Sequence, residues 1–220
     1  MRKATPPRVR RLVLFVGALA AAVVLAGCGP ELGPVTRLGS IPAPQFPELS
    51  DPSVVRVGGE YFIYGSNNHL RAPVTRTGNI DRRRTLTQKN NITHEGMPTK
   101  PAWTARSEQL WAPTVGRFGN RWIMYFSADR RNPPQPRNAQ CIGRAFANHP
   151  AGPFVPEANP WHCGLGGVGG ALDPQLFTDA QGRRWLLAAF GDTESPIHTM
   201  RLDANGNRVG NAVAILRRRH

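Results

Sequence analysis

Asp51-Pro52-Ser53-Val54, Ala112-Pro113-Thr114-Val115 and Asp173-Pro174-Gln175-Leu176 are three versions of one tetrapeptide pattern. Their first residues lie 61 positions apart in both intervals. Each is followed by a short apolar stretch, a polar turn that contains glycine, and a second apolar stretch that opens on an aromatic residue. This order is typical of a β-hairpin. Because the pitch is fixed, the sequence predicts repeated sheets of one design.

The apolar stretches predict an all-β fold. No window shows a long helical stripe of apolar residues, and Pro and Gly interrupt nearly every stretch. About four strands in each 61-residue unit are typical of a β-propeller blade, and about three blades fit in the chain. The strands expected from the pattern are at residues 54–57, 61–64, 115–118, 122–126, 141–146, 176–178, 185–190, 197–202 and 209–216.

Three blades leave two sheet faces without neighbours, which exposes a large apolar surface. The sequence therefore predicts either that the chain is an incomplete copy of a longer protein or that another polypeptide completes it. We favour truncation, because the third unit runs into Leu216-Arg217-Arg218-Arg219-His220 without a closing strand. Such a tail is what a frameshift would leave.

Residues 1–27 have the features of a bacterial lipoprotein signal peptide. Residues 1–11 carry five basic side chains and no acidic one, and residues 12–26 form an uncharged apolar run. This run is shorter than the roughly 18 residues expected of a membrane-spanning helix. Leu25-Ala26-Gly27-Cys28 resembles the lipoprotein motif in which the Cys is lipidated. We expect Cys28 to anchor the protein to the cell membrane, facing the extracytoplasmic side; the alternatives are an ordinary signal peptide and twin-arginine export through Arg10-Arg11.

Residues 28–50 are rich in Pro and Gly and are expected to be a flexible linker, which leaves residues 51–220 as one folded domain. The chain has 28 basic and 14 acidic residues, and loss of residues 1–27 removes five basic residues, so the remainder has 23 against 14 and a net charge of +9. No nucleic-acid motif accompanies this charge, so we predict no nucleic-acid partner, and the sequence points to no known protein partner. The charge either attracts anionic envelope polymers or forms a solvated surface.

Cys141 and Cys163 are an even pair once Cys28 is assigned to lipid. In an exported protein they are expected to form a disulfide. His162 beside Cys163 suggests a metal site as the alternative, but the spacing matches none of the usual zinc patterns. We therefore predict no metal site at these residues.

Taken together, the three repeat starts with the hairpins that follow them resemble glycoside hydrolase family 43, which includes arabinanases, α-L-arabinofuranosidases and β-xylosidases. Ile142-Gly143-Arg144-Ala145 followed by Gly152-Pro153-Phe154 is similar to the second blade of that family. The resemblance implies a five-bladed β-propeller, of which about three blades are present, and hydrolysis with inversion. It also leaves cofactors open, since some members hold a calcium ion on the propeller axis, although the His that usually helps to hold it belongs to a later blade.

The resemblance assigns to Asp51 the role of general base. It assigns to Asp173 the role of the residue that raises the pKa of the general acid and orients it. The general acid of the family is a Glu that opens the fourth blade, and that blade is absent. Glu108 and Glu194 do not stand at repeat starts and are poor substitutes. Apart from the resemblance, Asp-Pro can simply begin a strand, yet Ala112 at the matching position indicates that this turn does not require a carboxylate.

Several polar and aromatic residues are candidates for substrate binding. Trp111, directly before the second repeat start, is the preferred subsite wall, and Asn68 within Ser66-Asn67-Asn68-His69 either reaches the pocket or caps its own loop. Trp122 and Trp185 fall in one repeat column and are expected to be core residues between blades. The pattern leaves Trp103 and Trp161 undecided.

These observations predict an inverting O-glycosyl hydrolase that acts on arabinose- or xylose-containing polysaccharide and is feeble or inactive without its general acid. The alternative is a non-catalytic carbohydrate-binding lipoprotein of the envelope. An unrelated propeller interaction module is a third possibility, but it would not require Asp at two blade starts. The linkage and the exo or endo mode of attack do not follow from the sequence.

Overall fold

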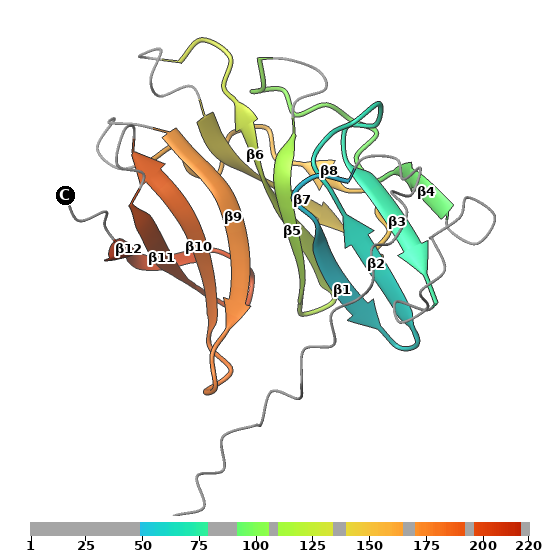
Figure 1. The fold of residues 1–220 in the computed structure, drawn as a ribbon. Helices are drawn as coiled ribbons and strands as arrows, with labels where there is room; N and C mark the ends of the chain where they lie inside the picture. The colour runs from blue at the N-terminus through green and yellow to red at the C-terminus, as the bar shows by residue number, and fades with distance from the viewer. Residues whose placement is uncertain are drawn as a thin grey trace, which may run out of the picture. The chain divides into compact units, whose positions relative to one another are not determined.

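Twelve β-strands make up the part of the chain that the computed structural model describes, which is residues 49–78, 92–105, 110–133, 140–164, 170–191 and 196–216 (Figure 1). These residues contain no helix that is long and apolar enough to cross a membrane. The predicted signal peptide, Cys28, Glu108, Glu194 and the C-terminal arginines lie outside the described residues.

The strands form three four-stranded sheets, each antiparallel and each connected in simple chain order. The all-β prediction is confirmed, and the arrangement is a partial β-propeller of three consecutive blades. Strands β3, β4 and β8 were not expected from the sequence. The bounds are β1 (Ser53–Val57), β2 (Glu60–Tyr64), β3 (Pro73–Thr77) and β4 (Ile92–Glu95); β5 (Trp111–Phe118), β6 (Arg121–Asp129), β7 (Gln140–Ala147) and β8 (Val155–Pro156); β9 (Gly170–Thr178), β10 (Arg184–Gly191), β11 (Ile197–Leu202) and β12 (Arg208–Leu216).

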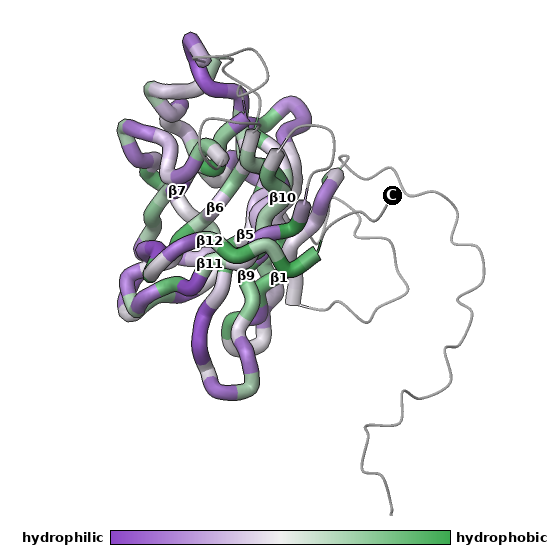
Figure 2. Tube along the Cα trace, turned by 90° about the vertical axis from the view of Figure 1, so that its left-hand side faces the viewer, coloured by the Kyte–Doolittle hydropathy of each residue, from purple (hydrophilic) through white to green (hydrophobic). Residues whose placement is uncertain are grey.

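The second sheet is covered on both faces. Trp122, Met124 and Phe126 of β6 belong to one hydrophobic core, shared with the first sheet. Ile123 and Tyr125, which alternate with them, belong to another core, shared with the third sheet. Because successive side chains of a strand point to opposite faces, this central strand has to be apolar throughout, as the sequence predicts. Figure 2 shows hydrophobic residues along the strands and hydrophilic residues at the turns.

The third sheet has one covered and one exposed face. Leu186, Ala188 and Phe190 are buried against the second sheet. Large apolar side chains on β9 and β12 remain exposed, among them Phe177 and Ile215, which are 54% and 55% exposed. Both line an apolar cavity of about 310 Å³ together with Trp185 and Leu187. The exposed apolar surface expected of a three-bladed arrangement is therefore present on this face.

Trp185 does not occupy the position that the sequence predicts for it. In the second hairpin Arg117 pairs with Trp122. Thr178, the residue 61 positions after Arg117, pairs in the third hairpin with Arg184 and not with Trp185. The third turn is one residue longer, and a shift of one residue moves a side chain to the opposite face of its sheet. Trp122 is buried between two sheets as predicted, while the indole of Trp185 lies on the exposed face of its sheet and donates to Asp179 Oδ2 at 2.9 Å.

Two further tryptophans pack against aromatic rings, and two cysteines are joined in a disulfide. Trp103 is buried and stacks on Phe126, and Trp161 packs edge-on against Tyr125. The structure joins Cys141 of β7 to Cys163 in a disulfide, as predicted.

His162, next to this disulfide, is enclosed in the same region of the second sheet. Burial, with smaller contributions from Arg208 and His198, lowers the pKa of His162 to about 4. Its imidazole is therefore neutral at neutral pH.

Candidate active site

The three repeat starts meet at one cavity. The first strands of the three sheets, β1, β5 and β9, are in contact in that order, so the residues that begin them gather at one end. The cavity measures about 340 Å³. It is lined by Asp51, Pro52, Ser53, Ala112, Pro113, Asp173, Pro174 and Gln175. Asp51 and Asp173, 122 positions apart in the sequence, therefore line the same cavity.

A β-bulge forms the second and third repeat starts, and at the first repeat start Asp51 and Pro52 together oppose Gly65 in the same way. In the second sheet Trp111 pairs with Ser127 and Thr114 with Tyr125, so Ala112 and Pro113 together oppose one residue of β6. In the third sheet Asp173 and Pro174 lie between the pairs that join β9 to β10 in the same way. Proline is tolerated here because a bulge leaves its residue outside the ladder of hydrogen bonds.

The first residue of each bulge has a left-handed backbone. The φ angles are +50° at Asp51, +43° at Ala112 and +55° at Asp173. Asp and Asn tolerate this region better than most residues, whereas alanine rarely adopts it. Since Ala112 has this conformation without a functional side chain, the fold imposes the conformation. A bulge turns the side chain of its residue away from the regular alternation, which directs the two carboxylates towards the cavity.

Serine hydroxyls connect neighbouring sheets at these bulges. Ser66 Oγ accepts a hydrogen bond from the Ala112 amide at 2.8 Å. Ser127 Oγ accepts one from the Asp173 amide at 2.9 Å. The two serines are 61 positions apart, as are the two amides, so the contact is part of the repeat. We call this pair of contacts the serine bridges.

The two acids differ in their surroundings. Asp51 Oδ2 accepts a hydrogen bond from Ser66 Oγ at 2.6 Å. Asp173 lies partly buried, and this burial together with the negative charge of Asp51 raises the pKa of the Asp173 carboxyl. The charge of Asp51 is therefore felt at Asp173 across the cavity that both residues line, which is the arrangement that the repeat predicts.

The two residues predicted to bind substrate lie elsewhere. Trp111 is half-buried at the start of β5, and Asn68 Oδ1 accepts a hydrogen bond from the Leu70 amide at 2.8 Å. Neither is among the residues that line the cavity. Asn68 thus caps its own loop, which was one of the two roles expected for it.

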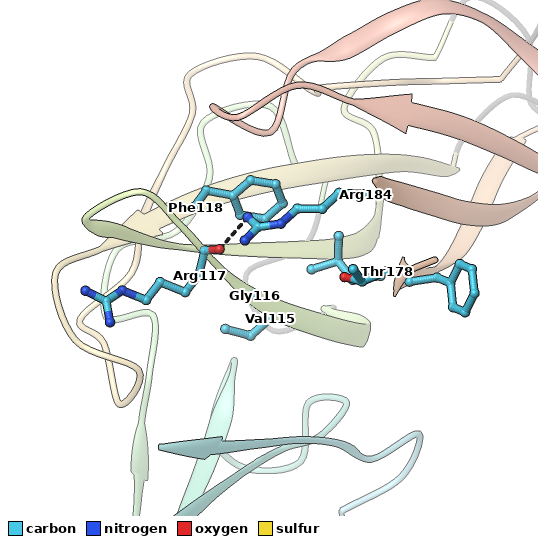
Figure 3. A pocket seen from close by; sticks show the side chains of 8 residues that line it. Val115, Gly116, Arg117, Phe118, Thr178 and Arg184 are labelled. Atoms are coloured by element: carbon cyan, nitrogen blue, oxygen red, sulfur yellow. Dashed lines mark hydrogen bonds between the residues drawn. The ribbon is translucent and has the colours of Figure 1, made fainter. Parts of the chain in front are cut away.

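Two features of the site were missed by reasoning from the sequence. The serine bridges could have been found, because Ser66 and Ser127 have the same spacing as the repeat starts. A second cavity, of about 240 Å³, lies at the opposite ends of β5 and β9 (Figure 3). There the Arg184 guanidinium stacks over the ring of Phe118 and donates to the Arg117 carbonyl oxygen, and nothing in the sequence pattern indicates this arrangement.

The described residues offer few side chains that could bind a metal ion together. They contain no group of three or more His, Cys, Asp or Glu side chains with the geometry to hold a metal ion.

The family model described as "Glycosyl hydrolases family 43" matches residues 46–218. The chain belongs to this family. Among curated proteins it is similar to an extracellular endo-alpha-(1->5)-L-arabinanase of Thermotoga petrophila, with 26% identity over 184 residues, 71% of this chain and 36% of that relative. The family 43 chain thus spans about a third of that relative.

Solved structures of family 43 enzymes share the fold. A thermostable family-43 glycoside hydrolase superimposes with a TM-score of 0.62 at 18% identity, over 81% of this chain and 56% of that one. An endo-arabinase from Bacteroides thetaiotaomicron gives 0.59 at 19% identity, over 77% of this chain and 56% of that one. Native Bacillus subtilis arabinanase gives 0.57 at 20% identity, over 76% and 56%.

Proposed function

We propose that this family 43 chain carries the general-base side of an inverting glycosidase site that acts on arabinose- or xylose-containing polysaccharide. The observation that carries the proposal is that Asp51 and Asp173 line one cavity. An inverting glycosidase needs a carboxylate that deprotonates water and a carboxylic acid that protonates the leaving oxygen, roughly 6.5–9.5 Å apart. In this proposal Asp51 is the carboxylate that activates water.

Asp173 is proposed to act on the general acid rather than on the substrate. A nearby anion makes it harder for a carboxylic acid to lose its proton. The pKa of Asp173 is raised by partial burial and by the charge of Asp51, which supports this role because it indicates a cavity in which one carboxylate is felt by another. A carboxylic acid placed in the same cavity would experience the same field.

The general acid is the missing member of the proposed site. Among the described residues the cavity is lined by two carboxylates, those of Asp51 and Asp173, and both are assigned. Loss of leaving-group protonation typically costs about 10²- to 10⁴-fold in rate. We therefore expect the chain by itself to turn over substrate feebly or not at all.

The substrate class rests on the relatives. The curated relative is an endo-arabinanase, another solved structure is an exo-1,5-alpha-L-arabinanase from a bovine ruminal library, and a Xanthomonas citri family member was solved with xylose. The competing proposal is a carbohydrate-binding envelope lipoprotein without turnover. Among the described residues two carboxylates line the cavity, and both have other assigned roles; this favours the competing proposal, since binding needs no general acid.

One experiment separates the two proposals. The release of reducing sugar from arabinan and xylan is measured beside a binding titration of the same polymers, with Asp51→Asn as the matched variant. Turnover that Asp51→Asn abolishes supports the enzyme. Binding without release in either protein means that the chain by itself is not catalytic and supports the carbohydrate-binding role, and neither binding nor release contradicts both proposals.

We also propose that the protein is anchored to the membrane by lipid at Cys28, facing the extracytoplasmic side. The basic and apolar character of residues 1–27 supports this. Cells fed labelled palmitate should label the full-length protein, and Cys28→Ser should abolish the label and release the protein from the membrane fraction. A labelled Cys28→Ser variant would contradict the assignment.

A further inference from the structure

We propose that Ser66 is the positioning residue that sets which oxygen of the Asp51 carboxylate faces the cavity. The inference rests on the proposed function, because it concerns the carboxylate that is to activate water. It starts from one side chain with two hydrogen bonds: Ser66 Oγ lies 2.8 Å from the Ala112 amide nitrogen and 2.6 Å from Asp51 Oδ2.

The directions of these two bonds are determined by the groups involved. The backbone amide of Ala112 can only donate, so Ser66 Oγ accepts that bond with a lone pair. Its single proton is then donated to Asp51 Oδ2. A distance of 2.6 Å is in the range of roughly 2.5–2.7 Å expected of a hydroxyl bound to an ionised carboxylate. Ser66 therefore supports the ionised form of Asp51.

Ser66 is itself held firmly. Its residue is 4% exposed, so solvent does not compete for its hydroxyl. Its own amide donates to the Ser50 carbonyl oxygen at 2.8 Å, directly before Asp51. Side chain and backbone of Ser66 are thus both tied to the bulge, and the hydroxyl cannot turn away without loss of a buried hydrogen bond.

The consequence for Asp51 is an asymmetric carboxylate. Oδ2 is bound to Ser66, while Oδ1 makes no hydrogen bond with any residue in the described ranges. A general base has to present a free lone pair to the water that it deprotonates. By holding Oδ2, Ser66 leaves Oδ1 for that water, and its hydrogen bond opposes the repulsion that Asp173 exerts on the ionised carboxylate.

The chain contains its own control for this inference. Ser127 makes the same serine bridge one repeat later, to the amide of Asp173 at 2.9 Å. The residue at the bulge of its own sheet is Ala112, which offers no carboxylate to the hydroxyl proton. Substitution of Ser127 therefore removes only a hydrogen bond to a backbone amide. Substitution of Ser66 removes such a bond and also the hydrogen bond to the Asp51 carboxylate.

The test compares Ser66→Ala, Ser66→Thr and Ser127→Ala in the full chain by carboxyl ¹³C NMR, with the Asp51 resonance identified through Asp51→Asn. We expect the Asp51 signal of Ser66→Ala to titrate at higher pH than in the unsubstituted protein, and Ser66→Thr to restore the original midpoint. Ser127→Ala should leave it in place. Thermal unfolding at neutral pH should show a larger loss for Ser66→Ala than for Ser127→Ala, because Ser66→Ala also removes the hydrogen bond to the ionised Asp51 carboxylate.

The outcomes distinguish this inference from the proposed function, because the NMR signal does not depend on hydrolysis. If turnover is measurable, Ser66→Ala should lower kcat about tenfold with little change in KM. An Asp51 signal that titrates alike in Ser66→Ala and the unsubstituted protein, or that moves equally in Ser127→Ala, overturns the inference. Should Ser66→Ala fail to fold, Ser66→Cys, which carries a weaker hydrogen-bond donor, is expected to give an intermediate shift of the Asp51 signal. An Asp51 signal that does not shift in Ser66→Cys overturns the inference as well.

Discussion

The first and second repeat starts share a backbone conformation and differ in the side chain of their first residue. Asp51 and Ala112 have φ angles of +50° and +43°, each is followed by proline, and both line the same cavity. One carries a carboxylate and the other a methyl group. The comparison shows that the bulge and its strained backbone belong to the scaffold and form without a carboxylate. A carboxylate at this position is directed into the cavity by that backbone. Structure and chemistry are thus separable at these positions.

The largest effect should come from Asp51→Asn, which keeps the shape and removes the base. Any release of reducing sugar should fall by about 10²- to 10⁴-fold. Ala112→Asn places the same amide on the same backbone one repeat later and should cost far less. Equal losses in the two variants, measured on arabinan and xylan, would mean that the first repeat start has no special chemical role.

Ala112→Asp makes the second repeat start resemble the other two. It adds a third carboxylate to the cavity, so at neutral pH it should be less stable than Ala112→Asn by about 1 kcal/mol through repulsion. The difference should vanish below about pH 4, where carboxylates are protonated. Urea unfolding at both pH values measures it, and a difference that persists in acid would point to packing instead.

Ala112→Gly tests the strained backbone itself. Glycine adopts a left-handed φ without steric cost, while alanine does not. We expect the free energy of unfolding to rise by about 0.5–1 kcal/mol, after allowance for the greater freedom of glycine in the unfolded chain. The same substitution in a regular part of a strand, such as Ala145, which pairs with Met124, should destabilise. A loss of stability in Ala112→Gly would show that the backbone is not strained there.

The smallest effect is expected for Asp173→Asn. The folded-state pKa of Asp173 is raised by partial burial and by Asp51, so ionisation of this carboxyl costs the folded protein stability at neutral pH. That stability is present below the unfolded-state pKa and is lost as pH rises through the folded-state pKa. Asp173→Asn should therefore raise Tm at pH 7. The gain in the free energy of unfolding should be less than about 1 kcal/mol, and it should disappear towards pH 3.

Repeats made the fold and the two acids predictable from the sequence. A fixed pitch with apolar second strands indicates stacked sheets, and equivalent positions in such sheets converge, which places Asp51 beside Asp173. Trp185 was placed on the wrong face because one extra residue in the turn at 179–183 reverses the alternation of the strand that follows. Face assignment is thus sensitive to loop length in a way that pitch alone does not reveal.

Other parts of the site depend on geometry that no residue pattern encodes. The left-handed φ of Ala112 could not be inferred, because alanine is among the residues least suited to it. The role of Ser66 depends on which of its neighbours can donate and which can accept, and this is clear only when Asp51 and the Ala112 amide are seen on either side of the hydroxyl.

The most direct measurement of the central claim, that two acids from different repeats share one cavity, is the titration of the Asp173 carboxyl by ¹³C NMR. In the unsubstituted chain the pKa of Asp173 should lie above the ordinary value for aspartate, and in Asp51→Asn it should fall, although partial burial will keep part of the shift. A titration of Asp173 that is the same in both proteins would show that the two carboxylates do not face one another across the cavity.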